Sequence, residues 1–214
     1  MSISKSGKTL ICFNVKNGQF KTASGSLTSL AWLTKFSKEK DLSTKKIFGD
    51  GELVLTLVND KGFTGTIGMT AQDAAYNKAL GFVKELSAGT GEVKQLSVVQ
   101  HSIYFETDYC GADGITKTKK TWVFGVEAQA PSETFDQNTD DINETNVEYQ
   151  ITIKGTNLKT ADGSADYVDA TTGQTVKVFT YSMLPDDVGY STFGDSVPVP
   201  KVPAATPVET PAQQ

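Results

Sequence analysis

The chain has 214 residues, 38% of them hydrophobic, and carries a formal net charge of −5 at pH 7. This composition fits a soluble globular protein and excludes a disordered chain, and no apolar run approaches the ~20 residues that a membrane span needs. All 20 basic residues are lysine, and this lack of arginine, with the acidic surplus, argues against sequence-specific nucleic-acid binding.

The first 15 residues contain no apolar h-region and no cleavage site, so we expect no secretory signal and synthesis in the cytoplasm. Cys12 and Cys110 are the two cysteines and stand far apart in the sequence. Reduced, structural thiols are favoured for them over a disulfide or a redox role.

The first 50 residues contain two short β-rich segments and a polar stretch. Residues 9–15 predict a strand closed by a turn at 16–18, and residues 30–36 predict an extended segment. Residues 37–46 are polar and hold four lysines, so we expect a long exposed loop there.

Residues 45–86 predict a strand, a turn, a second extended segment and one helix. Leu53, Leu55 and Leu57 alternate along the first strand, and residues 59–62 have the composition of a tight turn. Thr70 with Asp73 forms a variant of the capping box, which predicts that a helix starts here. Apolar residues at helical spacing are expected to pack this helix on a sheet: Ala74, Ala75, Ala79, Phe82 and Val83.

The second half of the chain favours strands. Alternating patterns cover residues 93–107, 121–129, 145–154 and 175–181. On the third of these, Val147, Tyr149, Ile151 and Ile153 are expected to share one face. Several short strands with one helix predict a mainly β fold, an antiparallel β sandwich or barrel with a packed α-helix.

Five of the seven prolines fall in residues 197–214. Proline lacks the amide donor that a sheet needs and favours an extended conformation. We therefore expect one domain over residues 1–196, followed by a flexible Pro-rich tail or linker over 197–214 that is dispensable for folding.

No residue pattern predicts a catalytic, cofactor-binding or metal site, and we expect no enzyme activity. His101 is the only histidine, and a structural or surface role is favoured over a general base. The glycines of residues 62–68 lack the spacing of a dinucleotide fingerprint, which favours close backbone packing over phosphate binding. Asp186 and Asp187 could serve acid-base chemistry, but any chain with 25 acidic residues contains such pairs, so they hardly indicate a catalytic site.

Two segments of opposite charge stand out as candidate contacts. The acidic segment 133–144 lacks the ligand alternation and central glycine of an EF-hand, so a solvated loop is favoured over a calcium site. A third interpretation is an electrostatic contact between subunits, pairing this segment with the basic one. The candidate residues are Lys35, Lys38, Lys40, Lys45 and Lys46 on the basic side, and Glu133, Asp136, Asp140, Asp141 and Glu144 on the acidic side.

The wording of two segments resembles a known family. Residues 62–82, "GFTGTIGMTAQDAAYNKALGF", and residues 122–155, "WVFGVEAQAPSETFDQNTDDINETNVEYQITIKG", resemble the major tail tube proteins of long-tailed, non-contractile bacteriophages of Gram-positive hosts. The Pro-rich end departs from a bare tube subunit. Some tail proteins of this kind carry a linker there to an immunoglobulin-like decoration domain.

The resemblance implies a protein that works by assembling. It implies a β sandwich with one helix that forms hexameric rings, which stack into the tail tube of the virion through which the genome is delivered. The implied partners are further copies of the chain, the tape-measure and tail completion proteins, and DNA that passes non-specifically through the lumen. Assembly in the host cytoplasm, without membrane insertion, belongs to the same expectation. The alternative is a β-sandwich binding or decoration module on the virion or cell surface.

Overall fold

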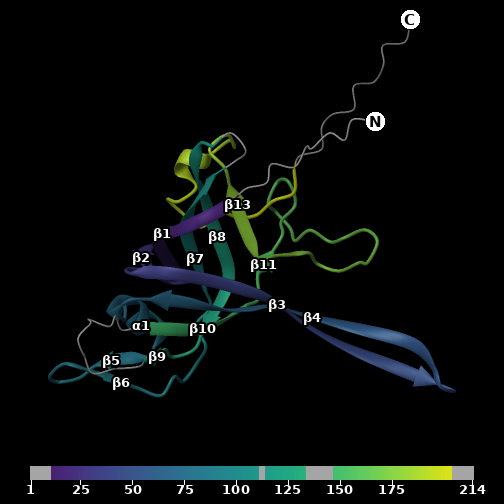
Figure 1. Ribbon diagram of the computed structural model, residues 1–214, viewed down its shortest axis with the longest axis horizontal. Helices are drawn as coiled ribbons and strands as arrows, with labels where there is room; N and C mark the ends of the chain where they lie inside the picture. Colours follow the sequence, from purple (N-terminus) through teal and green to yellow (C-terminus); the bar gives the residue numbers. More distant parts are fainter. Residues whose placement is uncertain (1–10, 111–113, 134–146, 204–214) are drawn as a thin grey trace, which may run out of the picture.

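Antiparallel strands make up most of the computed structural model, which describes residues 11–110, 114–133 and 147–203 (Figure 1). The strands lie in a sandwich-like arrangement with a single α-helix among the described residues, so the predicted fold class is confirmed.

The main sheet has the order β2-β1-β7-β8-β10-β4-β3, with β13 beside β8 and β9 beside β10. Its strands are β1 (Ile11–Thr22), β2 (Thr28–Ser29), β3 (Leu33–Gly49), β4 (Glu52–Met69), β7 (His101–Cys110), β8 (Thr116–Ala128), β9 (Ser132–Glu133), β10 (Val147–Ile153) and β13 (Thr180–Met183). The remaining elements are α1 (Ala74–Leu80), the pair β5 (Val83–Glu85) and β6 (Thr90–Glu92), the pair β11 (Thr156–Asn157) and β12 (Lys177–Val178), and a 3-10 turn, η1 (Tyr190–Thr192).

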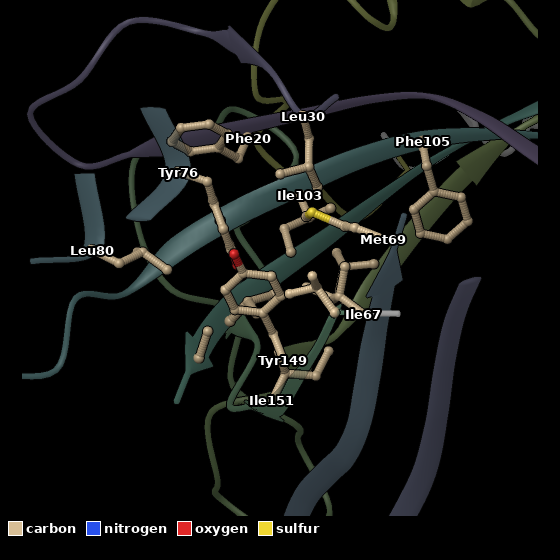
Figure 2. Packing of buried hydrophobic residues seen from close by; sticks show 14 of the residues in the cluster. Phe20, Leu30, Ile67, Met69, Tyr76, Leu80, Ile103, Phe105, Tyr149 and Ile151 are labelled. Atoms are coloured by element: carbon tan, nitrogen blue, oxygen red, sulfur yellow. The ribbon is translucent and has the colours of Figure 1, made fainter. Parts of the chain in front are cut away.

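Strand β10 lies at the centre of the larger core cluster (Figure 2). Its four predicted inward residues are all buried, with exposed fractions of 3% or less, and its polar residues alternate with them as predicted. The strands on either side, β8 and β4, contribute apolar side chains to the same cluster. Figure 2 shows Tyr149 and Ile151 of β10 packed among residues of β4, β7 and α1.

Strand β8 serves two core clusters, which differs from the prediction. Alternation over residues 121–129 predicts one side for Trp122, Phe124, Val126 and Ala128, but Trp122 and Phe124 lie in a smaller cluster and Val126 and Ala128 in the larger one. The change of side occurs at Gly125, whose φ of +63° interrupts the alternation. A Cβ on Gly125 would lie 2.4 Å from the Gly155 carbonyl oxygen, so the close approach requires glycine.

The helix is shorter than predicted and turned differently. Asp73 is the N-cap itself, because its carboxylate accepts a hydrogen bond from the Tyr76 N–H at 2.9 Å. The buried face consists of Tyr76, Asn77 and Leu80, whereas the three alanines expected to pack on the sheet are exposed. That expectation was wrong because a large aromatic residue, not the alanine stripe, fills the space over the sheet. Phe82 is buried as expected, and Val83 is half-buried.

Two predicted turns are β-bulges inside long strands. Strand β1 continues through residues 16–18, where Asn17 has φ +52° and the register with β7 shifts by one residue. Strand β4 continues through residues 59–62, where Gly62 has φ +96° and the register with β3 shifts likewise. Residues that favour turns also accommodate the positive φ of a bulge, so composition alone did not separate the two cases.

Residues 37–46 were expected to form a loop but belong to strand β3. Their polar composition reflects exposure, not irregular backbone: all of them except Ser37 and Asp41 are exposed.

The first residues of the Pro-rich segment pack on the body. The Lys159 N–H donates to the Pro200 carbonyl and the Val202 N–H donates to the Lys159 carbonyl, both at 2.9 Å. Val197 contacts the smaller core cluster. The division into residues 1–196 and 197–214 stays a prediction, since residues 204–214 lie outside the described part.

Candidate functional site

The distal half of the β3–β4 hairpin projects from the body (Figure 1). We call residues 42–60 the arm. At its tip Gly49 pairs with Glu52, and the two loop residues between them, Asp50 and Gly51, have φ of +51° and +82°. Positive φ at both central residues is typical of the two-residue hairpin turn that matches strand twist, and Asp-Gly is a favoured sequence for it.

Every residue of the arm is exposed, including large apolar ones. The exposed apolar side chains are Leu42, Ile47, Phe48, Leu53, Val54, Leu55, Leu57 and Val58. Large exposed apolar patches are rare on monomers, and where they occur they typically mark interaction surfaces.

The apolar side chains lie on both faces of the arm, with one face richer. Ile47 pairs directly with Leu55, and Leu57 with Lys45, so these side chains share one face. Val58 pairs with Thr44 on the opposite face and is 63% exposed. A two-stranded ribbon with apolar residues on both faces is suited to insertion between two neighbouring surfaces.

Lysines fix the arm where it leaves the body. Lys40 Nζ lies 2.6 Å from the Asp60 carboxylate and stands over the rings of Phe63 and Phe179, 4.5 and 5.0 Å from their centroids. The hydrogen bond from Lys40 and a second from the Gly62 N–H hold the pKa of Asp60 below its ordinary value. The contact with Phe179 reaches from the hairpin to the body, so it limits the directions in which the arm can point.

The predicted basic residues all lie on β3, in two groups. At the base, Lys35 lies 3.5 Å from Glu148, Lys40 pairs with Asp60, and Lys38 donates to the Thr180 hydroxyl at 3.1 Å. Lys45 and Lys46 lie on the arm and make no ion pair with any described residue.

Of the predicted acidic partners, one lies in the described part of the chain. Glu133 ends strand β9, while Asp136, Asp140, Asp141 and Glu144 lie outside the described residues. The contact between the two charged segments therefore stays a prediction.

His101 lies inside the protein. It is 3% exposed, and its Nε2 lies 2.8 Å from the Tyr76 hydroxyl. Burial lowers the pKa of His101 to about 4, so the imidazole is neutral at pH 7. Its contacts are those of a core residue.

The glycines of residues 62–68 have a structural role as well, and the described residues offer no metal site. Within residues 62–68, a Cβ on Gly65 would lie 2.0 Å from the Ser37 carbonyl oxygen, which agrees with close backbone packing. No group of three His, Cys, Asp or Glu side chains in the described ranges is arranged to hold a metal ion. None of the helices in the described part is both long and apolar enough to cross a membrane.

The arm was missed by the sequence analysis, although a signal for it was present. Asp50-Gly51 stands between two apolar-rich runs, a strong short-range indication of a hairpin. The composition of residues 59–62, Asn-Asp-Lys-Gly, predicts the turn there instead.

No protein-family model matches the chain, and no curated protein matches its sequence. Among solved structures, the chain is similar to one in the cryo-EM structure of the anti-feeding prophage (AFP) baseplate, 6-fold symmetrised. The TM-score is 0.36 and the sequence identity 8%, over 72% of this chain and 93% of that chain. A similarity at this level does not assign the chain to a family.

Proposed function

We propose that the chain is a structural subunit of a phage-type tail, and specifically that six copies form a ring and rings stack into a tail tube in the virion. The single observation that carries the proposal is the arm, an exposed apolar ribbon that one chain leaves uncovered. The resemblance of residues 62–82 and 122–155 to major tail tube proteins supports the same function.

A second copy of the chain is the partner that suits the arm best. Burial of the Leu55 and Leu57 side chains would stabilise the contact by about 25 cal/mol per Å² of apolar surface removed from water. A contact between the arm and a different surface of an identical neighbour is heterologous, and such contacts form rings when they close and stacks when they do not.

The charge of the chain agrees with a tube that conducts DNA. A net charge of −5 and the absence of arginine reduce fixed pairing with phosphates, so a nucleic acid could slide without being held. Tape-measure and tail completion proteins are the further partners of this proposal.

Electron microscopy and light scattering of the purified full-length protein test the proposal. We expect rings or tubes from the unaltered chain, and loss of assembly in the double variant Leu55→Glu with Leu57→Glu. The matched control is Leu96→Glu with Val98→Glu, which makes the same change at two exposed apolar positions off the arm, 85% and 61% exposed.

The control variant should assemble as the unaltered chain does. Discrete monomers of the unaltered chain at every concentration would contradict the proposal and favour the binding or decoration module. Equal assembly of the arm variant and the control would show that the arm is not the contact.

A further inference from the structure

A cavity of about 430 Å³ lies between the end of β1, the start of β7 and the segment 197–200. Apolar side chains form much of its wall, among them Phe124, Val197, Val199 and Pro200. Its charged lining residues are Lys21 and Lys159, and no acidic residue lines it. The cavity is large enough for a loop tip with one large side chain, since ligand pockets in proteins commonly span ~300–1,000 Å³.

The cavity carries uncompensated positive charge. Lys21 is half-buried and makes no ion pair with any described residue, whereas Lys159 is paired with Asp166 at 2.7 Å. Glu127 does not line the cavity; it accepts a hydrogen bond from the lining residue Gln100 at 3.0 Å and pairs with Lys154 at 2.8 Å. A half-buried ammonium group without a partner is stabilised by an anion, so the cavity favours a ligand that is both apolar and acidic.

The tip of the arm has this chemistry. Phe48 and Val54 are 63% and 69% exposed, and the charged residues between them are Asp50 and Glu52. No lysine occurs between Lys46 and Lys61, so the tip is the acidic end of an arm that is basic further back.

We propose that the arm tip of one copy docks in this cavity of a neighbouring copy. Asp50 or Glu52 then pairs with Lys21, and an apolar side chain of the tip lies against the wall formed by Phe124 and Val197. This inference rests on the proposed function and names the receiving surface of the same contact. It also gives residues 197–200 a role, since they complete the wall of the receptor.

Charge reversal tests the pairing in the full-length protein. We expect Lys21→Glu to raise the concentration for half-maximal assembly at least about fivefold, and Asp50→Lys to do the same. The charge swap that combines both changes in every copy should return assembly to within about twofold of the unaltered chain. The control is Lys94→Glu, an equal change at an exposed lysine that does not line the cavity.

Denaturant melts of each variant establish that the monomer fold is intact. Assembly that is no weaker with Lys21→Glu than with Lys94→Glu would overturn the docking site, and so would a charge swap that rescues nothing. In either case the arm variant with Leu55→Glu and Leu57→Glu still reports on the proposed function. If that variant blocks assembly while the swap fails, the arm docks elsewhere; if the unaltered chain never assembles, both proposals fall.

Discussion

Two buried hydrogen bonds join the helix to the sheet. The Tyr76 hydroxyl lies 2.8 Å from His101 Nε2, and the Tyr149 hydroxyl donates to Asn77 Oδ1 at 2.7 Å. The rings of Tyr76 and Tyr149 meet edge to face, and Figure 2 shows them side by side at the centre of the core. A buried polar group without a hydrogen-bond partner lowers the stability of the fold, so each of these bonds fixes the position of α1 on the sheet.

His101 makes stability fall as the solution becomes acidic. Its pKa is about 4 in the folded protein and near 6.5 when unfolded, so between these values the unfolded chain binds more protons. The folded state therefore loses stability as pH falls through this window, by about 2 kcal/mol between pH 7 and 5. Urea melts at the two pH values measure this loss, and we expect it to be much smaller in His101→Gln. An equal loss in both proteins would show that other groups cause it.

At the scale of elements, alternation predicted some strands well and others only in part: the alternating residues 93–107 form a strand only from His101 on. Strand β10 follows its period of two without interruption, and its buried face was predicted residue by residue. Strand β8 has equally clear alternation, yet Gly125 divides it between two clusters. The prediction of the buried face of α1 was wrong because Tyr76 carries more apolar area than the three alanines together, and the spacing of apolar residues does not express their size.

The candidate site was predicted only in part. The lysines at positions 35–46 were recognised as one basic segment, but not as part of a strand that leaves the body. The lysines of the arm are exposed because β10 pairs with β4 only over residues 63–69, so the hairpin extends past its neighbouring strand, and local composition does not express this.

The bend in β8 requires glycine. Gly125→Ala places a Cβ 2.4 Å from a backbone oxygen in addition to the strain of positive φ, so we expect a loss of at least about 3 kcal/mol in the free energy of unfolding. Gly173→Ala is the matched control, because Gly173 also has positive φ but no atom within 4 Å of the added Cβ. Strain alone should cost that variant ~1–2 kcal/mol. Denaturant melts that give equal losses would argue against the close approach.

Two truncations of the Pro-rich end are expected to differ, because residues 197–202 pack on the body. Truncation after Pro203 should leave the free energy of unfolding unchanged, because it removes none of the contacts described for residues 197–202. Truncation after Asp195 removes two backbone hydrogen bonds and the packing of Val197, which should cost ~2–4 kcal/mol. Thermal or denaturant melts of the two truncated chains separate these outcomes. A tolerated cut after Asp195 would restore the interpretation of the whole segment as a linker.

At the scale of the whole molecule, charge is expected to set the direction of growth. Lys45 and Lys46 of the arm have no described ion-pair partner, so reversing both to Glu leaves the known intrachain ion pairs intact. We expect that variant to block stacking while the monomer melts normally, and we expect assembly of the unaltered chain to weaken as salt rises. Each exposed pair contributes only ~0–1 kcal/mol, but in the proposed ring of six copies these contributions would add up.

Turbidity and electron microscopy across a salt series measure this effect. A second reversal, Asp140→Lys with Asp141→Lys, should restore growth if the acidic segment is the partner. Tubes that grow equally well from the reversed variant at low and high salt would rule the pairing out.

The exposed arm also makes the single subunit prone to aggregation. Within the arm, residues 42–60, strands β3 and β4 pair only with each other. Both outer edges of the arm therefore present unpaired backbone groups beside a row of apolar side chains. Ribbons of this kind can coalesce edge to edge into cross-β aggregates, and charged residues along them act as gatekeepers. With a sequence pI of about 5.0, mutual repulsion between subunits vanishes in mild acid. In the proposed assembly, docking of the arm therefore competes with aggregation, because a docked arm is covered whereas an undocked arm is open to edge-to-edge pairing.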